Sequence, residues 1–285
     1  MIMTSKMEIG KLFIVATPIG NLDDTSKRSL KTFKDVDLIA AEDTRKTRHL
    51  LSHFNIKAKM ISLHEHNEEE AAKKLIKVIQ NGSSVALVSD AGTPTINDPG
   101  YRLISQAHKE NIIVVPLPGP CSIITALSAS GLPSDRFCFE GYLPAKSESR
   151  KSKLNELAKE KRTLIFLISV HKINQSIDDM LLIFGGDRMA FLAREMTKIY
   201  EQCIRANLSE LLKMILGGEI PKKGEFVLVI EGCKDNNDNS LVLARELMNE
   251  LINNNLSSQA VEIVTKVTKI KRNIIYKMML ELKKQ

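Results

Sequence analysis

Hydrophobic and polar positions along the first part of the chain follow two alternating patterns. Short runs of consecutive apolar residues predict buried strands, and segments with apolar residues every three or four positions predict amphipathic helices. The predicted strands cover residues 11–16, 36–41, 59–63, 85–88 and 112–116. A helical pattern follows each of the first four. This strand–helix alternation predicts a parallel sheet with helices on its faces.

The alternation becomes less regular after PLPGP at residues 116–120, where we place a domain boundary. The next part is predicted to contain strands at 136–140, 163–168, 189–194 and 226–230, and helices at 122–129, 150–159, 173–184 and 209–216. A polar run, KDNNDNS at residues 234–240, then predicts a linker, since it has no apolar side chains to bury.

Two or three amphipathic helices are expected at the end of the chain. Their apolar stripes are Leu241, Ala244, Leu247 and Leu251; Ala260, Ile263, Val264 and Val267; and Ile274, Ile275, Met278 and Leu282. We expect Ser257 to cap the middle helix, and a turn at residues 268–270 to separate the last two. The spacing permits a helix-turn-helix, although a three-helix bundle used only for packing would give the same pattern. The predicted domains are therefore residues 1–117, 118–233 and 241–285.

Composition is that of a globular protein. The chain has 285 residues, 43% of them hydrophobic and 26% charged, which is enough for two cores. No apolar run could span a membrane, and the apolar core at residues 12–16 is too short for a signal peptide, so we expect a cytoplasmic protein without membrane contact. The four cysteines form no CxxC pair and are expected to be reduced thiols.

The net charge of +7 and a pI near 9.1 favour an anionic partner such as nucleic acid. A base-composition bias towards lysine and asparagine codons would also produce a basic chain. The distribution of charge favours a binding surface, because residues 257–285 contain seven basic and only two acidic side chains.

Polar clusters stand where the first four predicted strands end, at residues 18–21, 42–45, 64–68 and 89–98. The carboxyl ends of parallel strands meet at one edge of a sheet, so these loops can converge on a ligand. The fourth loop, in SDAGTPTINDPG, contains neither a GxGxxG nor a P-loop motif. Taken alone, it is as consistent with a surface connection as with a binding site.

Two further clusters have open interpretations. His64 and His66 alternate beside Glu68, but the HExxH spacing is absent, so we expect a polar, substrate-facing loop and no metal site. Lys146 begins a basic patch with Arg150, Lys151 and Lys153; this patch could contact phosphate or form a solvated helix face.

Six motifs together carry a resemblance. They are TPIGNL (17–22), AAEDTR (40–45), LHEHNE (63–68), SDAGTPTINDPG (89–100), PLPGPCSIITALSASGLPSDRFCFEGYLPAK (116–146) and LAREMTK (192–198). In this order they resemble the ribosomal RNA small-subunit methyltransferase I family of the tetrapyrrole-methylase superfamily, over nearly the whole chain.

The resemblance implies two α/β domains with S-adenosylmethionine in the cleft between them, a helical RNA-binding segment at the C-terminus, and a homodimer. The implied reaction is 2′-O-methylation of a cytidine ribose in the decoding region of 16S rRNA, with the rRNA or the 30S subunit as partner. Two alternatives stay open: methylation of a tetrapyrrole such as a precorrin, and a non-catalytic RNA-binding factor in ribosome assembly.

The resemblance also implies site residues. Those expected to hold the cofactor or line its pocket are Pro18, Asp90, Thr93, Cys121, Ser122 and Leu167. Substrate-side candidates are Arg45, Asn67 and Lys146. A ribose hydroxyl becomes a good nucleophile only when it loses a proton, so a base is expected, and His66, Glu68 and Glu42 are the candidates. No metal is required.

One position departs from the family pattern. The family has an acidic residue shortly before its histidine, whereas this chain has Ile168 ahead of His171. Any role of that carboxylate cannot be transferred, which keeps the non-catalytic alternative open.

Overall fold

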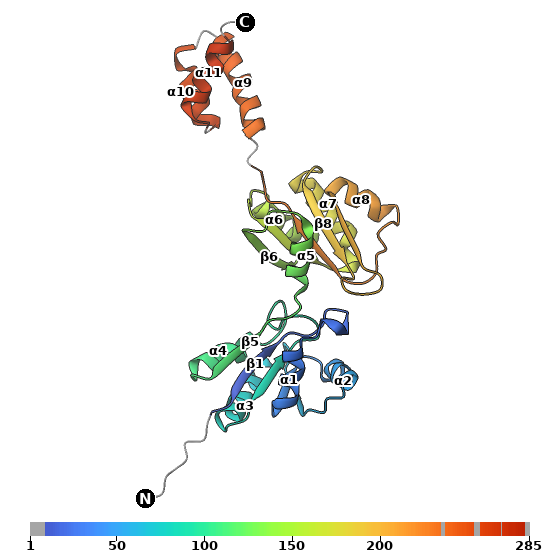
Figure 1. Cartoon of the computed structure of the whole chain (residues 1–285). Coiled ribbons are helices and arrows are strands. Elements are labelled where there is room, and N and C mark those ends of the chain that lie inside the picture. The colour runs from blue at the N-terminus through green and yellow to red at the C-terminus, as the bar shows by residue number, and fades with distance from the viewer. Residues whose placement is uncertain (1–8, 235–236, 254–256, 269, 283–285) are drawn as a thin grey trace, which may run out of the picture. The chain divides into compact units, whose positions relative to one another are not determined.

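The computed structural model describes residues 9–234, 237–253, 257–268 and 270–282. The chain divides into two compact units, Met1–Gly232 and Cys233–Gln285. The first unit contains two five-stranded sheets, one after the other along the chain, and the second is helical (Figure 1). No helix among the described residues is long and apolar enough to cross a membrane.

The first sheet is parallel throughout, as predicted. Its strands are β1 (Lys11–Val15), β2 (Leu38–Ala41), β3 (Met60–Ser62), β4 (Val85–Val88) and β5 (Ile113–Leu117). Their spatial order is β3-β2-β4-β1-β5, and every pairing is parallel. The carboxyl ends of the strands therefore share one edge, where the predicted polar loops begin.

Helices cover both faces of this sheet in pairs. They are α1 (Lys27–Asp35), α2 (Thr44–His53), α3 (Glu68–Gln80) and α4 (Tyr101–Lys109). Neighbouring residues of β4 face the two pairs. Ala86 packs in the core with α1 and α2, whereas Leu87 packs in the core with α3 and α4. In Figure 1 the two pairs stand on opposite sides of the strands.

The sequence predicts a cap at Asp43 or Thr44 for α2 and at Asp23, Asp24 or Thr25 for α1; the first prediction is confirmed and the second is wrong. Asp43 caps α2, with its side chain accepting the Arg45 N–H, as expected for a carboxylate at an N-cap. We expected Asp23, Asp24 or Thr25 to cap the preceding helix. Instead, Leu22–Asp24 form a short 3₁₀ turn, η1, and Ser26 caps α1. The chain makes this extra turn before it enters the helix.

The second sheet is mixed, which explains the irregular pattern in this part of the sequence. Its strands are β6 (Phe137–Tyr142), β7 (Thr163–Ile168), β8 (Met189–Arg194), β9 (Gln202–Asn207) and β10 (Phe226–Ile230), in the order β6-β7-β10-β8-β9. Only β6 and β7 pair in parallel; the other pairings are antiparallel.

The two faces of the second sheet are covered by different numbers of helices. They are α5 (Ser122–Ser130), α6 (Ser147–Leu157), α7 (Ile173–Phe184) and α8 (Leu208–Leu216), with a 3₁₀ turn, η2 (Val170–Lys172), before α7. Helix α5 packs on one face, and the other three pack on the opposite face. Arg150 of α6 is buried and pairs with Asp179 of α7 at 2.7 Å. Its side chain therefore does not belong to the exposed basic patch predicted around Lys146.

In the described part of the second unit, three helices pack together: α9 (Asn237–Asn253), α10 (Ser257–Thr268) and α11 (Arg272–Leu282). Their shared core includes Ala244, Val264 and Ile275, which come from the three predicted stripes. The predicted linker at residues 234–240 is partly wrong, because α9 begins at Asn237 and so includes its last four residues. Asn and Asp favour helix starts, which reconciles the polar sequence with the helix. The side chains of Ser257 and Leu241, and Lys269 of the predicted turn, lie outside the described residues.

Candidate active site

Two motif loops join at the carboxyl edge of the first sheet. Thr17, after β1, pairs with Gly92, after β4, through two backbone hydrogen bonds of 2.9 and 3.0 Å. Gly92 has φ +81°, a conformation that favours glycine over other residues. The loops TPIGNL and SDAGTPTINDPG are therefore joined into one surface at this edge.

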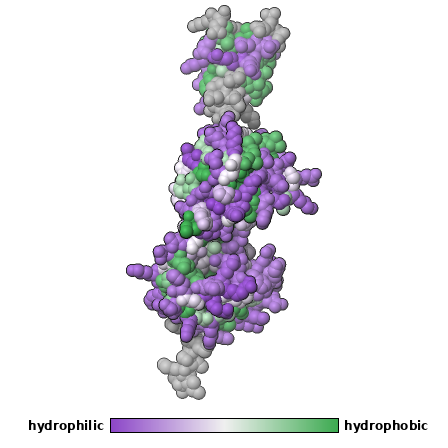
Figure 2. Space-filling model, turned by 90° about the vertical axis from the view of Figure 1, so that its right-hand side faces the viewer, coloured by the Kyte–Doolittle hydropathy of each residue, from purple (hydrophilic) through white to green (hydrophobic). Residues whose placement is uncertain are grey.

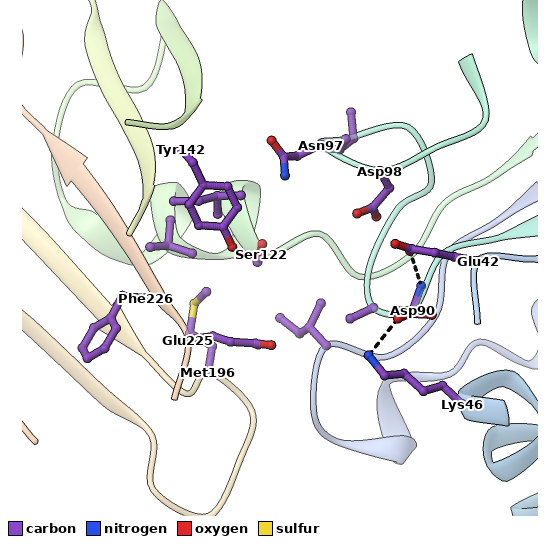
Figure 3. Close-up of a pocket in the computed structure, with 15 residues that line it drawn as sticks. Glu42, Lys46, Asp90, Asn97, Asp98, Ser122, Tyr142, Met196, Glu225 and Phe226 are labelled. Atoms are coloured by element: carbon purple, nitrogen blue, oxygen red, sulfur yellow. Dashed lines mark hydrogen bonds and ion pairs between the residues drawn. The ribbon is translucent and has the colours of Figure 1, made fainter. Parts of the chain in front are cut away.

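Carboxylates from neighbouring strand ends meet beside this junction. Glu42, at the end of β2, accepts the Asp90 backbone N–H at 3.1 Å. The Asp90 carboxylate accepts the Asp43 N–H at 3.0 Å and pairs with the Lys46 ammonium at 2.7 Å. These contacts fix the direction of the Asp90 side chain (Figure 3).

Asp98 is a third carboxyl group at the same place. Burial and, after it, the negative charges of Glu42 and Asp90 together raise the pKa of Asp98 from 3.8 to about 6, against the opposing effect of a hydrogen bond with Ser89. Repulsion and desolvation both disfavour the ionised form. Asp98 consequently titrates near neutral pH.

These groups line a cavity of about 390 Å³ between the two sheets. From the first sheet come Ile19, Glu42, Lys46, Asp90, Ala91, Ile96, Asn97 and Asp98; from the second come Ser122, Tyr142, Leu167, Met196, Glu225, Phe226 and Val227. Figure 3 shows Asn97 and Asp98 on one side of this space and Tyr142 and Glu225 on the other. One wall is thus rich in carboxyl groups, and the other contributes mainly apolar side chains.

The loop after β8 closes the second wall. Glu195 and Lys198 form an ion pair at 2.9 Å, and Lys198 also pairs with Glu225 at 3.0 Å. Thr197 accepts the Asn21 backbone N–H at 3.0 Å, which connects this loop to the loop after β1. The motifs TPIGNL and LAREMTK, far apart in sequence, are therefore in direct contact.

Backbone strain occurs on both sides of the cavity. Thr95 and Asn97 have φ of 72° and 66°, and Glu195 and Thr197 have φ of 51° and 63°. Positive φ is costly for a threonine, whose side chain is branched at Cβ. Strain of this kind persists where the surroundings enforce it, and it clusters at functional sites.

A second cavity, of about 490 Å³, adjoins the first. It is lined by Thr17, Pro18, Ile19, Gly20, Leu22, Lys46, His49, Leu50, His53, Asp90, Ala91, Lys198 and Glu225. Lys46, Asp90 and Glu225 line both cavities. The ion pair between Lys46 and Asp90 therefore stands between them.

The residues expected to hold the cofactor are distributed over three cavities. Asp90, Ser122 and Leu167 line the 390 Å³ cavity together with Glu42, a candidate base; Pro18 lines the 490 Å³ cavity, and Cys121 lines a third, of about 330 Å³. The Thr93 hydroxyl donates to the Pro120 carbonyl at 2.9 Å. This hydrogen bond links the loop after β4 to the segment where the chain passes from the first sheet to the second.

The other predicted site residues do not line these cavities. Glu68 accepts the backbone N–H groups of Gly100 and Arg102 at the start of α4. Asn67 holds its own loop, accepting the His64 N–H and donating to the Ser62 carbonyl.

Three more candidates are exposed at the surface: His66, Arg45, which pairs with Asp43, and Lys146, which stands at the start of α6. Their proposed roles stay predictions. Among the described residues, no group of three or more His, Cys, Asp or Glu side chains is arranged to hold a metal ion.

Several residues of the cavity were not among the sequence candidates. Asn97, Asp98 and Met196 lie inside quoted motifs, so the motifs themselves could have indicated them. Tyr142 stands in the same long motif as Ser122. Glu225 precedes a buried strand and has no sequence signal of its own; only the pairing of β10 in the sheet brings it to the site.

Comparisons with known proteins agree with this arrangement. The family model for tetrapyrrole (corrin/porphyrin) methylases matches residues 11–212. The ribosomal RNA small subunit methyltransferase I of Vibrio cholerae is 49% identical over 279 residues, covering 95% of this chain and 94% of that protein. The protein of the same name from Haemophilus influenzae is 50% identical, covering 94% and 95%.

Solved structures show the same fold at low sequence identity. A diphthine synthase matches with a TM-score of 0.58 and 15% identity, covering 78% of this chain and 90% of its own. A uroporphyrin-III C-methyltransferase from Thermus thermophilus, complexed with S-adenyl homocysteine, matches with a TM-score of 0.54 and 15% identity, covering 78% and 97%. The fold, the cavity between the sheets and the close relatives lead to one conclusion: the chain belongs to the tetrapyrrole methylase family, within its ribosomal RNA small subunit methyltransferase I group.

Proposed function

We propose that this protein transfers a methyl group from S-adenosylmethionine to the 2′-oxygen of a cytidine ribose in the decoding region of 16S rRNA. The observation that carries the proposal is the carboxylate-lined cavity between the two sheets, built from the motifs shared with the group. Relatives that are 43–50% identical and bear the rRNA methyltransferase name support rRNA as the substrate. The cofactor is S-adenosylmethionine, the methyl donor of this family.

The residues present fit this cofactor. S-Adenosylmethionine carries a positive sulfonium and an ammonium group, a ribose and an adenine ring, and when bound it supplies an electrophilic methyl group. Asp90 and Glu42 offer negative charge and hydrogen-bond acceptors, and Leu167 and Met196 offer apolar contact. A cavity of about 390 Å³ lies in the range typical of small-molecule sites.

The contacts of Asp90 support a role in cofactor binding. Its carboxylate is held by the Lys46 ammonium and the Asp43 N–H, while its own N–H is held by Glu42. A carboxylate fixed in this way need not reorganise when it receives a cation or a hydroxyl group, which favours tight and oriented binding. We assign Asp90 to cofactor binding.

The base must lie inside the cavity to reach a ribose hydroxyl. Of the three candidates, Glu42 lines the cavity, whereas Glu68 caps α4 and His66 is exposed. Asp98 is a further candidate because its pKa of about 6 lies near the working pH of a general base. We therefore propose Glu42 or Asp98 as the group that accepts the proton.

The departure at Ile168 has a structural context. Ile168 is buried in the core formed with α6, α7 and α8, whereas its neighbour Leu167 lines the cavity. Successive residues of a strand point to opposite faces, so Ile168 faces away from the cavity. This placement weighs against the non-catalytic alternative.

The test uses labelled S-adenosylmethionine with purified 30S subunits or free 16S rRNA, followed by nucleoside analysis. The expected product is 2′-O-methylcytidine. Methylation of a base would contradict the proposal, and efficient turnover of a precorrin in place of rRNA would support the tetrapyrrole alternative. Absence of cofactor binding in calorimetry would favour the non-catalytic one.

A matched pair of variants tests the assigned role of Asp90. Asp90→Asn keeps the shape of the side chain but removes the charge beside Lys46, so cofactor affinity should fall about tenfold or more, the effect of losing a charge-assisted contact. Asp135→Asn removes an exposed carboxylate elsewhere and should leave the affinity unchanged. Equal affinities of the two variants would contradict the assignment.

Three further expectations stay proposals. We propose that residues 241–285 bind RNA, that the protein acts as a homodimer, and that it works in the cytoplasm, where ribosomal subunits are assembled. Light scattering of the purified protein tests the dimer, because a mass of one 31.9 kDa chain would contradict it.

A further inference from the structure

Helices α1 and α2 carry an unusual excess of positive charge. Their basic side chains are Lys27, Arg28, Lys31, Lys34, Arg45, Lys46 and Arg48, and Asp35 is the only carboxylate within the two helices. All seven basic residues are exposed. Both helices pack on the same face of the first sheet, so their basic side chains lie on one side of the domain, here called the α1–α2 layer.

The opposite layer of the same sheet provides an internal comparison. Helices α3 and α4 contain five Lys or Arg residues and three Glu residues. Part of their charge is neutralised locally: Lys73 pairs with Glu69, and Arg102 pairs with Glu68 and Glu69. The excess of positive charge is therefore a property of one face of the domain rather than of the whole surface.

Several cations of the α1–α2 layer have no carboxylate to neutralise them. Within the described part of the chain, Lys31, Arg45 and Lys46 form ion pairs with Asp35, Asp43 and Asp90, respectively. Arg28, Lys34 and Arg48 have no ion pair there. Exposed cations without partners are the groups that contact phosphates and displace their counterions.

The charged layer leads directly to the active site. Lys46, His49 and His53 of α2 line the 490 Å³ cavity, which shares Lys46 and Asp90 with the proposed cofactor cavity. The side of the domain that carries α1 and α2 faces the viewer in Figure 2, where it is largely hydrophilic. A polyanion lying on this face would have a route for one nucleotide towards the carboxylates.

We infer that the outer face of α1 and α2 is a docking surface for the rRNA phosphate backbone next to the target nucleotide, with Arg28, Lys34 and Arg48 as phosphate contacts. This inference rests on the proposed function, since it names where that substrate is held. It places part of the RNA contact on the first sheet domain, in addition to the helical unit at the C-terminus.

The test compares two triple variants of the full chain. Arg28→Gln/Lys34→Gln/Arg48→Gln removes three exposed charges from the α1–α2 layer. Lys74→Gln/Lys77→Gln/Lys109→Gln removes three exposed charges, also without an ion pair among the described residues, from the α3–α4 layer. Glutamine is a good helix former, so both variants should keep their helices.

Binding of a 16S rRNA fragment from the decoding region is measured by fluorescence anisotropy at several salt concentrations. Each phosphate contact contributes about 0.9 to the steepness with which log affinity falls against log salt concentration. One contact therefore raises the affinity about eightfold when the salt concentration is lowered from 1 M to 0.1 M. If all three contacts are lost, the slope should fall by about 2.7, and affinity at 0.1 M salt by about 500-fold. The α3–α4 variant should stay close to wild type, and cofactor affinity should be unchanged in both.

Defined outcomes would overturn the inference. If both triple variants bind and methylate rRNA like wild type, the docking surface is wrong and the proposed function stands. If wild type neither binds nor methylates rRNA, the proposed function fails as well. Equal losses in the two variants would indicate a diffuse charge effect. If the α1–α2 variant lost binding to anionic lipid vesicles but kept its rRNA affinity, the surface would belong to a membrane contact.

Discussion

Ionisation of Asp98 should destabilise the protein, so Asp98→Asn is expected to be a stabilising substitution above neutral pH. The carboxyl group stands beside Glu42 and Asp90 in the cavity, and burial and repulsion raise its pKa from 3.8 to about 6. Asparagine has nearly the same shape, stays neutral, and can still form a hydrogen bond with Ser89. The substitution therefore removes the charge and leaves the packing in place.

The size and sign of the effect follow from linkage. A raised pKa means that the native state holds its proton more tightly than the unfolded state, so this contribution is present below about pH 4 and is lost as pH rises through about 6. Each unit of pKa difference corresponds to ~1.4 kcal/mol, which sets a ceiling of about 3 kcal/mol. Because the side chain is partly exposed, solvent screening should reduce the effect to about 1–2 kcal/mol.

Urea unfolding of wild type, Asp98→Asn and the exposed control Asp135→Asn tests this expectation at about pH 4 and about pH 8. With an unchanged m value, the midpoint of Asp98→Asn should exceed that of wild type at the higher pH and approach it at the lower pH. The control should follow wild type at both. The reasoning would be refuted if Asp98→Asn raised the urea midpoint equally at the two pH values, or if Asp135→Asn raised it as well.

Three other perturbations have defined outcomes. Arg150→Ala removes the buried partner of the Asp179 carboxylate and leaves it only the longer contact with Lys151 at 3.5 Å. The free energy of unfolding, measured by urea unfolding, should therefore fall by about 3 kcal/mol, the lower end of the range for a broken buried ion pair; an unchanged midpoint would mean that the pair is not buried in solution. Gly20→Ala puts a Cβ 2.6 Å from the Thr197 hydroxyl, so it should separate the loop after β1 from the loop after β8 and weaken cofactor binding, measured by calorimetry. An affinity equal to that of wild type would contradict this prediction. Deleting residues 233–285 should weaken rRNA binding but leave cofactor affinity unchanged, and equal loss of both would show that this unit is structural.

Much of the fold could be predicted because the decisive interactions are local in sequence. The run of apolar residues in β4 indicated a buried strand, and the Asp43 cap indicated the start of α2. The order of strands could not be predicted in this way. Hydrogen bonds place β4 between β1 and β2, and nothing within residues 85–88 specifies those neighbours.

Strand topology alone predicted the site only on the side of the first sheet, whereas Ser122 and Leu167 of the second half were indicated by the family resemblance. Glu42 and Asp90 follow parallel strands, so the topology alone brings them to one edge. Glu225 precedes an antiparallel strand, and it reaches the cavity only because β10 lies between β7 and β8. Glu68, an acidic residue of a polar cluster, accepts two backbone N–H groups at the start of α4, a contact between distant segments that its own position in the sequence does not indicate.

The passage of the chain from the first sheet to the second has a consequence for assembly. Every strand up to β5 belongs to the first sheet and every later strand to the second, so residues 118–121 are the single covalent tether between the halves of the cavity. A short tether keeps its two ends at an effective concentration on the order of millimolar. The two halves of the site therefore associate within one chain. A longer tether should lower the effective concentration of one half at the other, and so weaken their association, without changing either sheet.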